Sequence, residues 1–177
     1  MTDIRQGGNI HLATNTIFWH DGVDEEMLEV IQKGFHLMRN SPITLKLSSG
    51  GGDVNAGLAI CDIMHTHKHR VTVEVWGRAE SMAAVILQAA DIRKISSSSH
   101  IMIHQGVEEP AADTKKNIKA YLKLSDNMDD ICDSLVLRRI QKKFPKYSWN
   151  QFRQETHFDI YFKAQEALKW NLVDKII

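Results

Sequence analysis

The chain has 177 residues, 43% hydrophobic and 25% charged, which suits one soluble domain, residues 1–177, with a full-sized core. Its 22 Lys and Arg balance its 22 Asp and Glu, so the charge gives no support for binding nucleic acid or an anionic membrane. No apolar run could span a bilayer, and "MTDIRQGGNIHL" lacks a signal-peptide core. We therefore expect a cytoplasmic protein with reduced thiols at Cys61 and Cys132.

Strands and helices alternate through the first part of the chain. The pattern predicts a short strand and turn at 15–24, a helix at 24–39, a strand at 43–49, a helix ending near residue 67, a strand at 70–76, a helix at 81–90, and strands at 92–96 and 100–105. The helix at 81–90 is apolar on nearly all sides and should be buried, whereas the serine run at 96–99 should be a solvated turn. The alternation predicts an α/β fold with a substantially parallel sheet.

The second part of the chain is mainly helical and heavily charged. An unbroken helix over 114–144 would be about 45 Å long, so we expect it either to be broken or to project and meet another subunit. Pro145 should end it. A short helix in "SWNQFRQE", a strand or extended turn in "FDIYF", and a last helix and strand in "AQEALKWNLVDKII" follow.

A glycine-rich turn, "SSGGGDV" at 48–54, lies between a predicted strand and helix. Glycines there allow unusual backbone angles and let amide hydrogens approach a ligand or an anion. The GxxxxGK[ST] phosphate loop is not matched, because no lysine follows. A tight turn without chemistry is the alternative.

Ser81 follows a predicted strand and opens the buried helix. It is either an ordinary helix N-cap or a nucleophile held at a strand-to-helix turn. The Met82 amide lies in the first helical turn, and with the Gly51 amide it would form a two-point oxyanion hole.

Two histidines, His100 and His104, lie four residues apart in "HIMIHQG". Histidine is the natural base for a serine hydroxyl, and His104, at the strand end, is better placed than His100. A surface or capped histidine is the plain alternative. Spacing alone leaves the acid that would orient the imidazole open among four residues: Asp91, Asp129, Asp159 and Asp174.

Four segments in order resemble the proteolytic subunit of the Clp protease, the ClpP family. They are "GGDVNAGLAICDIM" (51–64), "GRAESMAAVILQAA" (77–90), "SSSHIMIHQ" (97–105) and "HFDIYFKAQEALKWNLVDKII" (157–177). The resemblance covers roughly residues 15–177. It implies a serine peptidase with Ser81 as nucleophile, His104 as base, Asp159 as acid, and the amides of Gly51 and Met82 as oxyanion hole, without a metal or organic cofactor.

The resemblance also implies a fold and an assembly. The fold is the ClpP/crotonase-like α/β fold of repeated ββα units, with 114–144 as a protruding handle. Members of the family form seven-membered rings, usually stacked in pairs, that enclose the sites in a chamber. The handle would bury its apolar stripe against a partner; the stripe comprises Ile118, Tyr121, Leu122, Leu124, Met128 and Ile131.

Some features depart from the family pattern. Only about 15 residues precede "TIFW", fewer than in the family, which weakens the expectation of an AAA+ unfoldase partner and of ATP dependence through it. In this the chain is similar to ClpP-like proteases of phages and mobile elements. Glu80 replaces a small residue beside Ser81. A carboxylate there would oppose an oxyanion, so we expect it to point away, toward a basic partner.

Other interpretations are weaker. "HTHKH" at 65–69 has no acid or cysteine to complete a metal site, and "RRIQKKFPK" is a solvated helix face more readily than a nucleic-acid contact. Cys61 lies on an apolar helix face, where a thiol is inert. Two functions compete with the peptidase: a crotonase-type acyl-CoA enzyme and a catalytically silent structural subunit.

Overall fold

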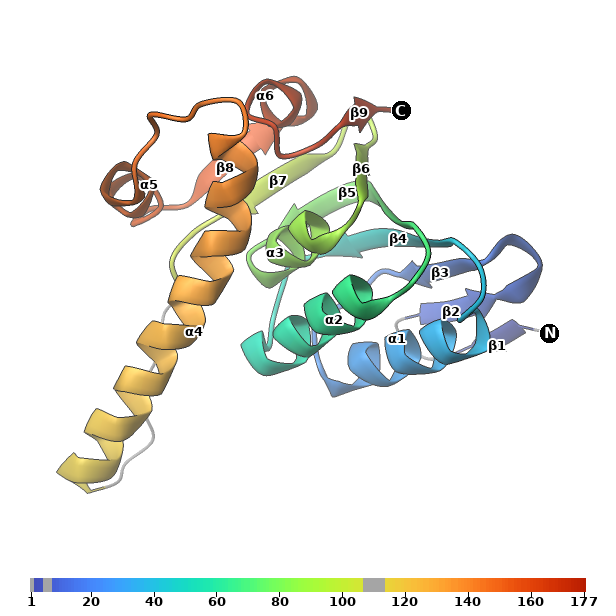
Figure 1. Cartoon of the computed structure of the whole chain (residues 1–177), viewed down its shortest axis with the longest axis horizontal. Helices are drawn as coiled ribbons and strands as arrows, with labels where there is room; N and C mark the ends of the chain where they lie inside the picture. Colours follow the sequence, from blue (N-terminus) through green and yellow to red (C-terminus); the bar gives the residue numbers. More distant parts are fainter. Residues whose placement is uncertain (1, 5–7, 107–113) are drawn as a thin grey trace.

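The computed structural model describes residues 2–4, 8–106 and 114–177, which form a nine-stranded sheet with helices packed on it (Figure 1). The central strands are β3 (Thr16–Trp19), β4 (Ile43–Ser49), β5 (Val71–Glu80) and β6 (Ile92–Ile95), and each pairs with the next in parallel. The short β9 (Lys175–Ile176) adds in parallel beyond β6. The predicted parallel α/β sheet is therefore confirmed.

Three helices connect the parallel strands and lie side by side over the sheet (Figure 1): α1 (Glu25–Leu37), α2 (Val54–Thr66) and α3 (Met82–Ala89). The side chains of Asp24 and Asp53 cap α1 and α2 by accepting hydrogen bonds from first-turn amides. All eight residues of α3 are buried, as its apolar sequence predicts. The core fills the space between these helices and the sheet.

Two strands near the N-terminus were not predicted. β1 (Thr2–Ile4) and β2 (Gly8–His11) extend the sheet beyond β3 in antiparallel order. β2 carries one buried hydrophobic side chain, Ile10. A single apolar position does not give the alternating pattern by which a strand is predicted from the sequence. The backbone of Gly8 lies against the Trp19 ring, where a Cβ would clash at 2.4 Å.

β5 is longer than the predicted strand, because it continues through Gly77 to Glu80. Residues 72–75 pair with β6, whereas residues 78–80 pair with β7 (His100–Ile103), which pairs in turn with antiparallel β8 (Ile160–Lys163). Gly77 has φ 91°, which few other residues adopt, and it marks the exchange of partners. The end of β5 and the strands β7 and β8 thus form a branch of the sheet.

The serine run at 96–99 is only partly the solvated turn that the sequence predicted. Ser97 and Ser98 are exposed, but Ser96 and Ser99 are buried. The Ser99 hydroxyl accepts the N–H of Gly77 at 2.7 Å and contacts the Ser96 hydroxyl. The two hydroxyls can be buried because they form hydrogen bonds with each other and with backbone groups of β5, near the glycine at which β5 changes partners.

α4 (Lys115–Gln141) is one unbroken helix that projects from the body of the molecule (Figure 1). Its 27 residues correspond to about 40 Å at ~1.5 Å per residue. It ends at Gln141, before Pro145, so the proline does not itself end the helix. Four large apolar side chains of the predicted stripe are exposed: Tyr121, Leu122, Leu124 and Ile131.

The C-terminal part comprises α5 (Trp149–Glu155), α6 (Ala164–Lys169) and β9, and a buried arginine anchors it. Arg93 is 2% exposed and donates to Gln88 Oε1 at 2.9 Å, to the Asn171 carbonyl at 2.6 Å and to the Asp174 carboxylate. Burial acts to raise the pKa of Asp174, but hydrogen bonds from Arg93 outweigh it and lower that pKa overall. Nowhere in the described ranges is a helix both long and apolar enough to cross a membrane.

Candidate active site

Ser81 lies where β5 ends and α3 begins, in a backbone conformation that serine rarely adopts. Its φ is 53° and its ψ −123°, and its N–H donates to the Met102 carbonyl at 2.9 Å. Such a conformation costs on the order of 1–3 kcal/mol and persists only where the surroundings impose it. Although Ser81 occupies the N-cap position, its side chain makes no capping hydrogen bond. The plain N-cap interpretation of Ser81 is therefore wrong.

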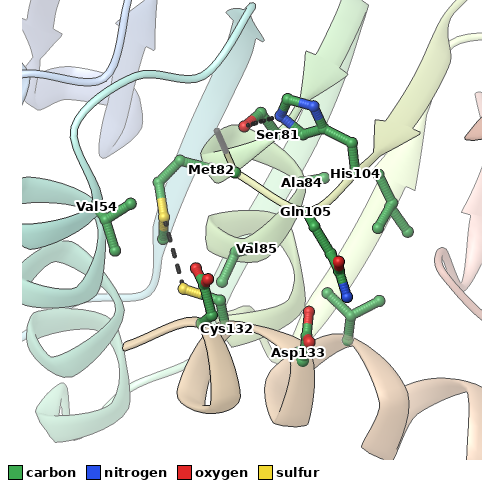
Figure 2. A pocket seen from close by; sticks show the side chains of 13 residues that line it. Val54, Ser81, Met82, Ala84, Val85, His104, Gln105, Cys132 and Asp133 are labelled. Atoms are coloured by element: carbon green, nitrogen blue, oxygen red, sulfur yellow. Dashed lines mark hydrogen bonds between the residues drawn. The ribbon is translucent and has the colours of Figure 1, made fainter. Parts of the chain in front are cut away.

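The Ser81 hydroxyl instead faces His104, which follows β7 (Figure 2). The distance from Ser81 Oγ to His104 Nε2 is 2.8 Å. The next residue, Gln105, donates its N–H to the Thr156 carbonyl at 2.9 Å, which fixes the backbone just after His104. The imidazole and the hydroxyl are thus within hydrogen-bond reach, as a general base and its nucleophile must be.

Asp159 lies on the other side of the His104 ring. Ile103 and Ile160 are paired in the antiparallel ladder of β7 and β8, which places the residues just beyond them next to each other. Asp159 Oδ1 is 3.3 Å from His104 Nδ1. These partners assign the tautomer: Nδ1 carries the proton, on the side of the carboxylate, and Nε2 accepts from the Ser81 hydroxyl.

Two of the other candidate acids lie elsewhere. Asp91 accepts the N–H of Val71 at 2.8 Å, and Asp174 pairs with Arg93. Asp129, on α4, lines the pocket beside Ser81. The structure therefore brings together Ser81, His104 and Asp159 from three separate elements.

The glycine loop passes directly against Ser81. Gly51 has φ 88°, and a Cβ added there would lie 2.7 Å from the Ser81 Cβ and 3.0 Å from the Met82 nitrogen. The loop is held by Val23, whose N–H donates to the Gly51 carbonyl at 2.9 Å. The Gly51 N–H donates to the Ser49 hydroxyl at 3.2 Å. The two residues predicted to form an oxyanion hole are thus neighbours, and in this structure the Gly51 amide donates to Ser49.

A pocket of about 60 Å³ opens beside Ser81 (Figure 2). Its walls come from the start of α2, from α3, from the residues around His104 and from α4, and they are mainly apolar, with Val54, Met82, Val85, Ile103, Cys132 and Val136. A wider groove of about 500 Å³ passes Ser81 and His104 between the glycine loop and α4. The groove and the pocket meet at Ser81 and His104, so a peptide that lies in the groove can insert one of its side chains into the pocket.

The pocket also contains a neutral thiol and a paired acid. Burial, with the nearby charges of Asp129 and Asp133 as smaller causes, raises the pKa of Cys132 to about 12. Burial also raises the pKa of Asp133, although its hydrogen bond to Arg153 at 3.0 Å acts in the opposite direction. Cys61 is buried, and burial raises the pKa of its thiol as well. Both thiols therefore stay protonated at neutral pH and are poor nucleophiles.

Glu80 has basic partners, as we expected. One carboxylate oxygen is 2.8 Å from His100 Nε2, and the other is 3.2 Å from Arg78 Nη1. From the sequence, His100 was considered only as an alternative base, and neither Arg78 nor Tyr161 was predicted to belong to the site. The available signal was the spacing: residues 78 and 80 share one face of their strand, and residues 100 and 104 share one face of the next strand in the branch.

The weaker interpretation of "HTHKH" as a metal site gains no support. His67 contacts the Ser41 carbonyl at 2.9 Å and packs edge-on against Phe35. Within the part of the chain that the structure describes, no group of three His, Cys, Asp or Glu residues is arranged to hold a metal ion.

Ser81, His104 and Asp159 thus lie in one row on an α/β sheet, with a hydrogen bond between Ser81 and His104 and an ion-pair distance between His104 and Asp159. The Clp protease family model matches residues 8–177, so the chain belongs to the Clp protease family. Among solved structures, a mutant of ClpP1 from Listeria monocytogenes is similar, with a TM-score of 0.78 and 27% sequence identity. The match covers 94% of this chain and 92% of that one. The predicted family and fold class are therefore confirmed.

Proposed function

We propose that this Clp-type protease is a serine endopeptidase in which Ser81, His104 and Asp159 act as a triad. The observation that carries the proposal is the 2.8 Å contact between Ser81 Oγ and His104 Nε2, made by a serine in a strained backbone conformation. A helix cap would need neither the strain nor the imidazole.

The geometry supports an acyl-transfer mechanism. Ser81 Oγ attacks the peptide carbonyl while its proton passes to His104 Nε2, and Asp159 stabilises the imidazolium through Nδ1. The Met82 and Gly51 amides donate hydrogen bonds to the developing oxyanion. His104 then protonates the leaving amine, the C–N bond of the tetrahedral intermediate breaks, and the acyl group remains as an ester on Ser81. Water, deprotonated by His104, hydrolyses that ester and restores the enzyme.

The shape and polarity of the site favour a peptide with an apolar side chain next to the cleaved bond. The groove along α4 accommodates an extended chain, and the pocket takes that side chain. No step of this mechanism requires a cofactor or a metal.

The exposed apolar residues of α4 support a homo-oligomer, and the family suggests a seven-membered ring or a stacked pair of rings. Tyr121, Leu122, Leu124 and Ile131 would be buried between subunits. Native mass spectrometry, with and without candidate AAA+ unfoldases, measures the ring size and tests for that partner.

Labelling with a fluorophosphonate probe tests the proposal. We expect wild-type protein to label at Ser81 and to cleave a fluorogenic peptide, and Ser81→Ala to keep its assembly and lose both. Ser97→Ala is the matched control, because Ser97 is exposed in the turn after β6. An assembled wild-type protein that takes no label would overturn the proposal in favour of a silent structural subunit. Peptide cleavage by Ser81→Ala would place the nucleophile elsewhere.

A further inference from the structure

A cluster of charged side chains lies on the same branch of the sheet as the proposed triad. In the parallel ladder of β5 and β7, Arg78 is opposite His100 and Glu80 is opposite Met102. Paired residues in adjacent strands present their side chains to the same face, so this face also includes His104, two residues beyond Met102. The cluster and the site therefore share one surface.

Glu80 is the fixed centre of this cluster. Its side chain is 15% exposed, and its two carboxylate oxygens contact His100 and Arg78 separately. A carboxylate held by two groups in this way keeps its own orientation and that of its partners. The His100 ring is therefore fixed by Glu80.

The His100 ring in turn contacts Tyr161 on β8. The two ring centroids are 5.9 Å apart, with the ring planes tilted by 48°. The Tyr161 hydroxyl donates to Asp159 Oδ2 over 3.5 Å. Desolvation and the negative charges of Asp159 and Glu80 raise the pKa of Tyr161, so its phenol keeps the proton that it donates.

Asp159 is a carboxylate that needs such support. It is 53% exposed and lies just before β8, outside the ladder. Its Oδ1 faces His104, and its Oδ2 accepts from Tyr161. A half-exposed carboxylate can turn toward water, and a donor on its second oxygen opposes that rotation.

We propose that Tyr161 is a positioning residue that holds Asp159 toward His104, and that Glu80 and His100 support it by fixing the Tyr161 ring. None of the three touches the reacting atoms; each acts through Asp159. The inference rests on the proposed peptidase function. The inference assigns Glu80, the residue before Ser81, a supporting role that its position in the sequence does not indicate.

Steady-state kinetics on a short fluorogenic peptide test the proposal in the assembled full-length protein. We expect Tyr161→Phe to lower kcat about 3- to 10-fold with KM unchanged, because one hydrogen bond to a charged group is lost. Glu80→Gln should lower kcat less, because the Tyr161 ring loses part of its support through His100 but keeps the hydroxyl that donates to Asp159. Tyr147→Phe is the matched control: it removes a tyrosine–carboxylate hydrogen bond, to Glu155, that involves neither Asp159 nor His104, and should leave kcat unchanged.

A double-mutant cycle separates positioning from a general structural role. If Tyr161 acts through Asp159, Tyr161→Phe should cause no further loss of kcat in an Asp159→Asn background. An equal loss in both backgrounds, or an effect on KM alone, would overturn the proposal.

Crystal structures of the wild type and Tyr161→Phe give a readout that does not need activity. We expect the Asp159 side chain to turn to solvent in the variant and its contact with His104 Nδ1 to lengthen beyond 3.3 Å. An unchanged Asp159 would reject the positioning role. If wild-type protein takes no fluorophosphonate label, the peptidase proposal fails, and the crystal comparison still decides whether Tyr161 positions Asp159.

Discussion

The sulfur of Cys132 lies 4.0 Å from the sulfur of Met82, the residue that follows Ser81 (Figure 2). This contact joins the projecting helix α4 to the first turn of α3. The Met82 side chain is confined from the other side by Gly57, where an added Cβ would lie 2.3 Å from Met82 Cγ. One wall of the proposed substrate pocket is therefore formed by α4, the helix that would also make the proposed subunit contacts.

Replacing Cys132 with a bulky residue should block the pocket. We expect Cys132→Phe to lower kcat/KM at least tenfold, or about 1.4 kcal/mol, for peptides with a large apolar residue before the cleaved bond. Peptides with glycine or alanine there should lose much less. Cys132→Ala is the control and should retain cleavage of the large-residue peptides. An equal loss for all peptides in an assembled Cys132→Phe protein would show that this pocket does not select the side chain.

Removing the proposed base should slow the reaction at Ser81 itself. We expect His104→Ala to lower the rate of fluorophosphonate labelling on the order of 10²- to 10⁴-fold, because general-base catalysis is lost. His69→Ala, which removes an exposed histidine in the bend after α2, should label like wild type. A His104→Ala protein that labels at the normal rate would require another base.

Removing Glu80 should not activate the enzyme. Its carboxylate faces His100 and Arg78, so no repulsion of an oxyanion is relieved by its loss. We expect Glu80→Ala to lower peptidase activity modestly and to reduce the free energy of unfolding by about 1 kcal/mol, measured by urea denaturation. A large rise in activity with unchanged assembly would mean that Glu80 turns toward the oxyanion site in the working enzyme.

The Arg93–Asp174 pair should make stability depend on acid pH. Because the folded-state pKa of Asp174 is lowered, its contribution is complete above the unfolded-state pKa and is lost as pH falls through the folded value. We expect Asp174→Asn to cost about 2 kcal/mol in urea unfolding at pH 7, since Arg93 stays buried without its counter-ion.

The difference between the Asp174→Asn variant and the wild type should shrink below the ordinary aspartate pKa of 3.8. Asp62→Asn, an exposed position on α2, is the control and should show no such pH dependence. A difference that stays constant from pH 7 to strong acid would show that the Asp174 charge is not the cause.

Elements with strong local patterns could be predicted from the sequence. The strand at 43–49 has the bounds of β4, and the buried helix at 81–90 is α3 within one residue at each end. β5 was predicted to end at Trp76, because Gly77 interrupts the alternation. Its continuation depends on new partners in β7, and pairing between distant segments leaves no local pattern in the sequence.

The candidate site, too, was predicted from the residues only in part. The positions of Ser81 and His104 at element ends pointed to their pairing, whereas the residues alone left the acid open among four. The choice of Asp159 came from the family resemblance, and its contact with His104 depends on the β7–β8 ladder, which joins segments more than 50 residues apart. The contact of His100 with Tyr161 depends on the same ladder, so it too could not be predicted.

The exchange of partners by β5 at Gly77 gives the two ends of the site different freedom to move. Ser81 follows the end of β5, which pairs there with β4 and with β7, and its N–H donates to the Met102 carbonyl of β7, so its amide should be protected from hydrogen exchange for as long as the pairing of β5 with β7 holds. Asp159 precedes β8, which pairs only with β7 among the described strands, so that end can open locally. The proposed nucleophile thus follows a strand that is paired on both sides, whereas the proposed acid lies beside an edge strand, whose position we expect substrate or subunit contacts to adjust.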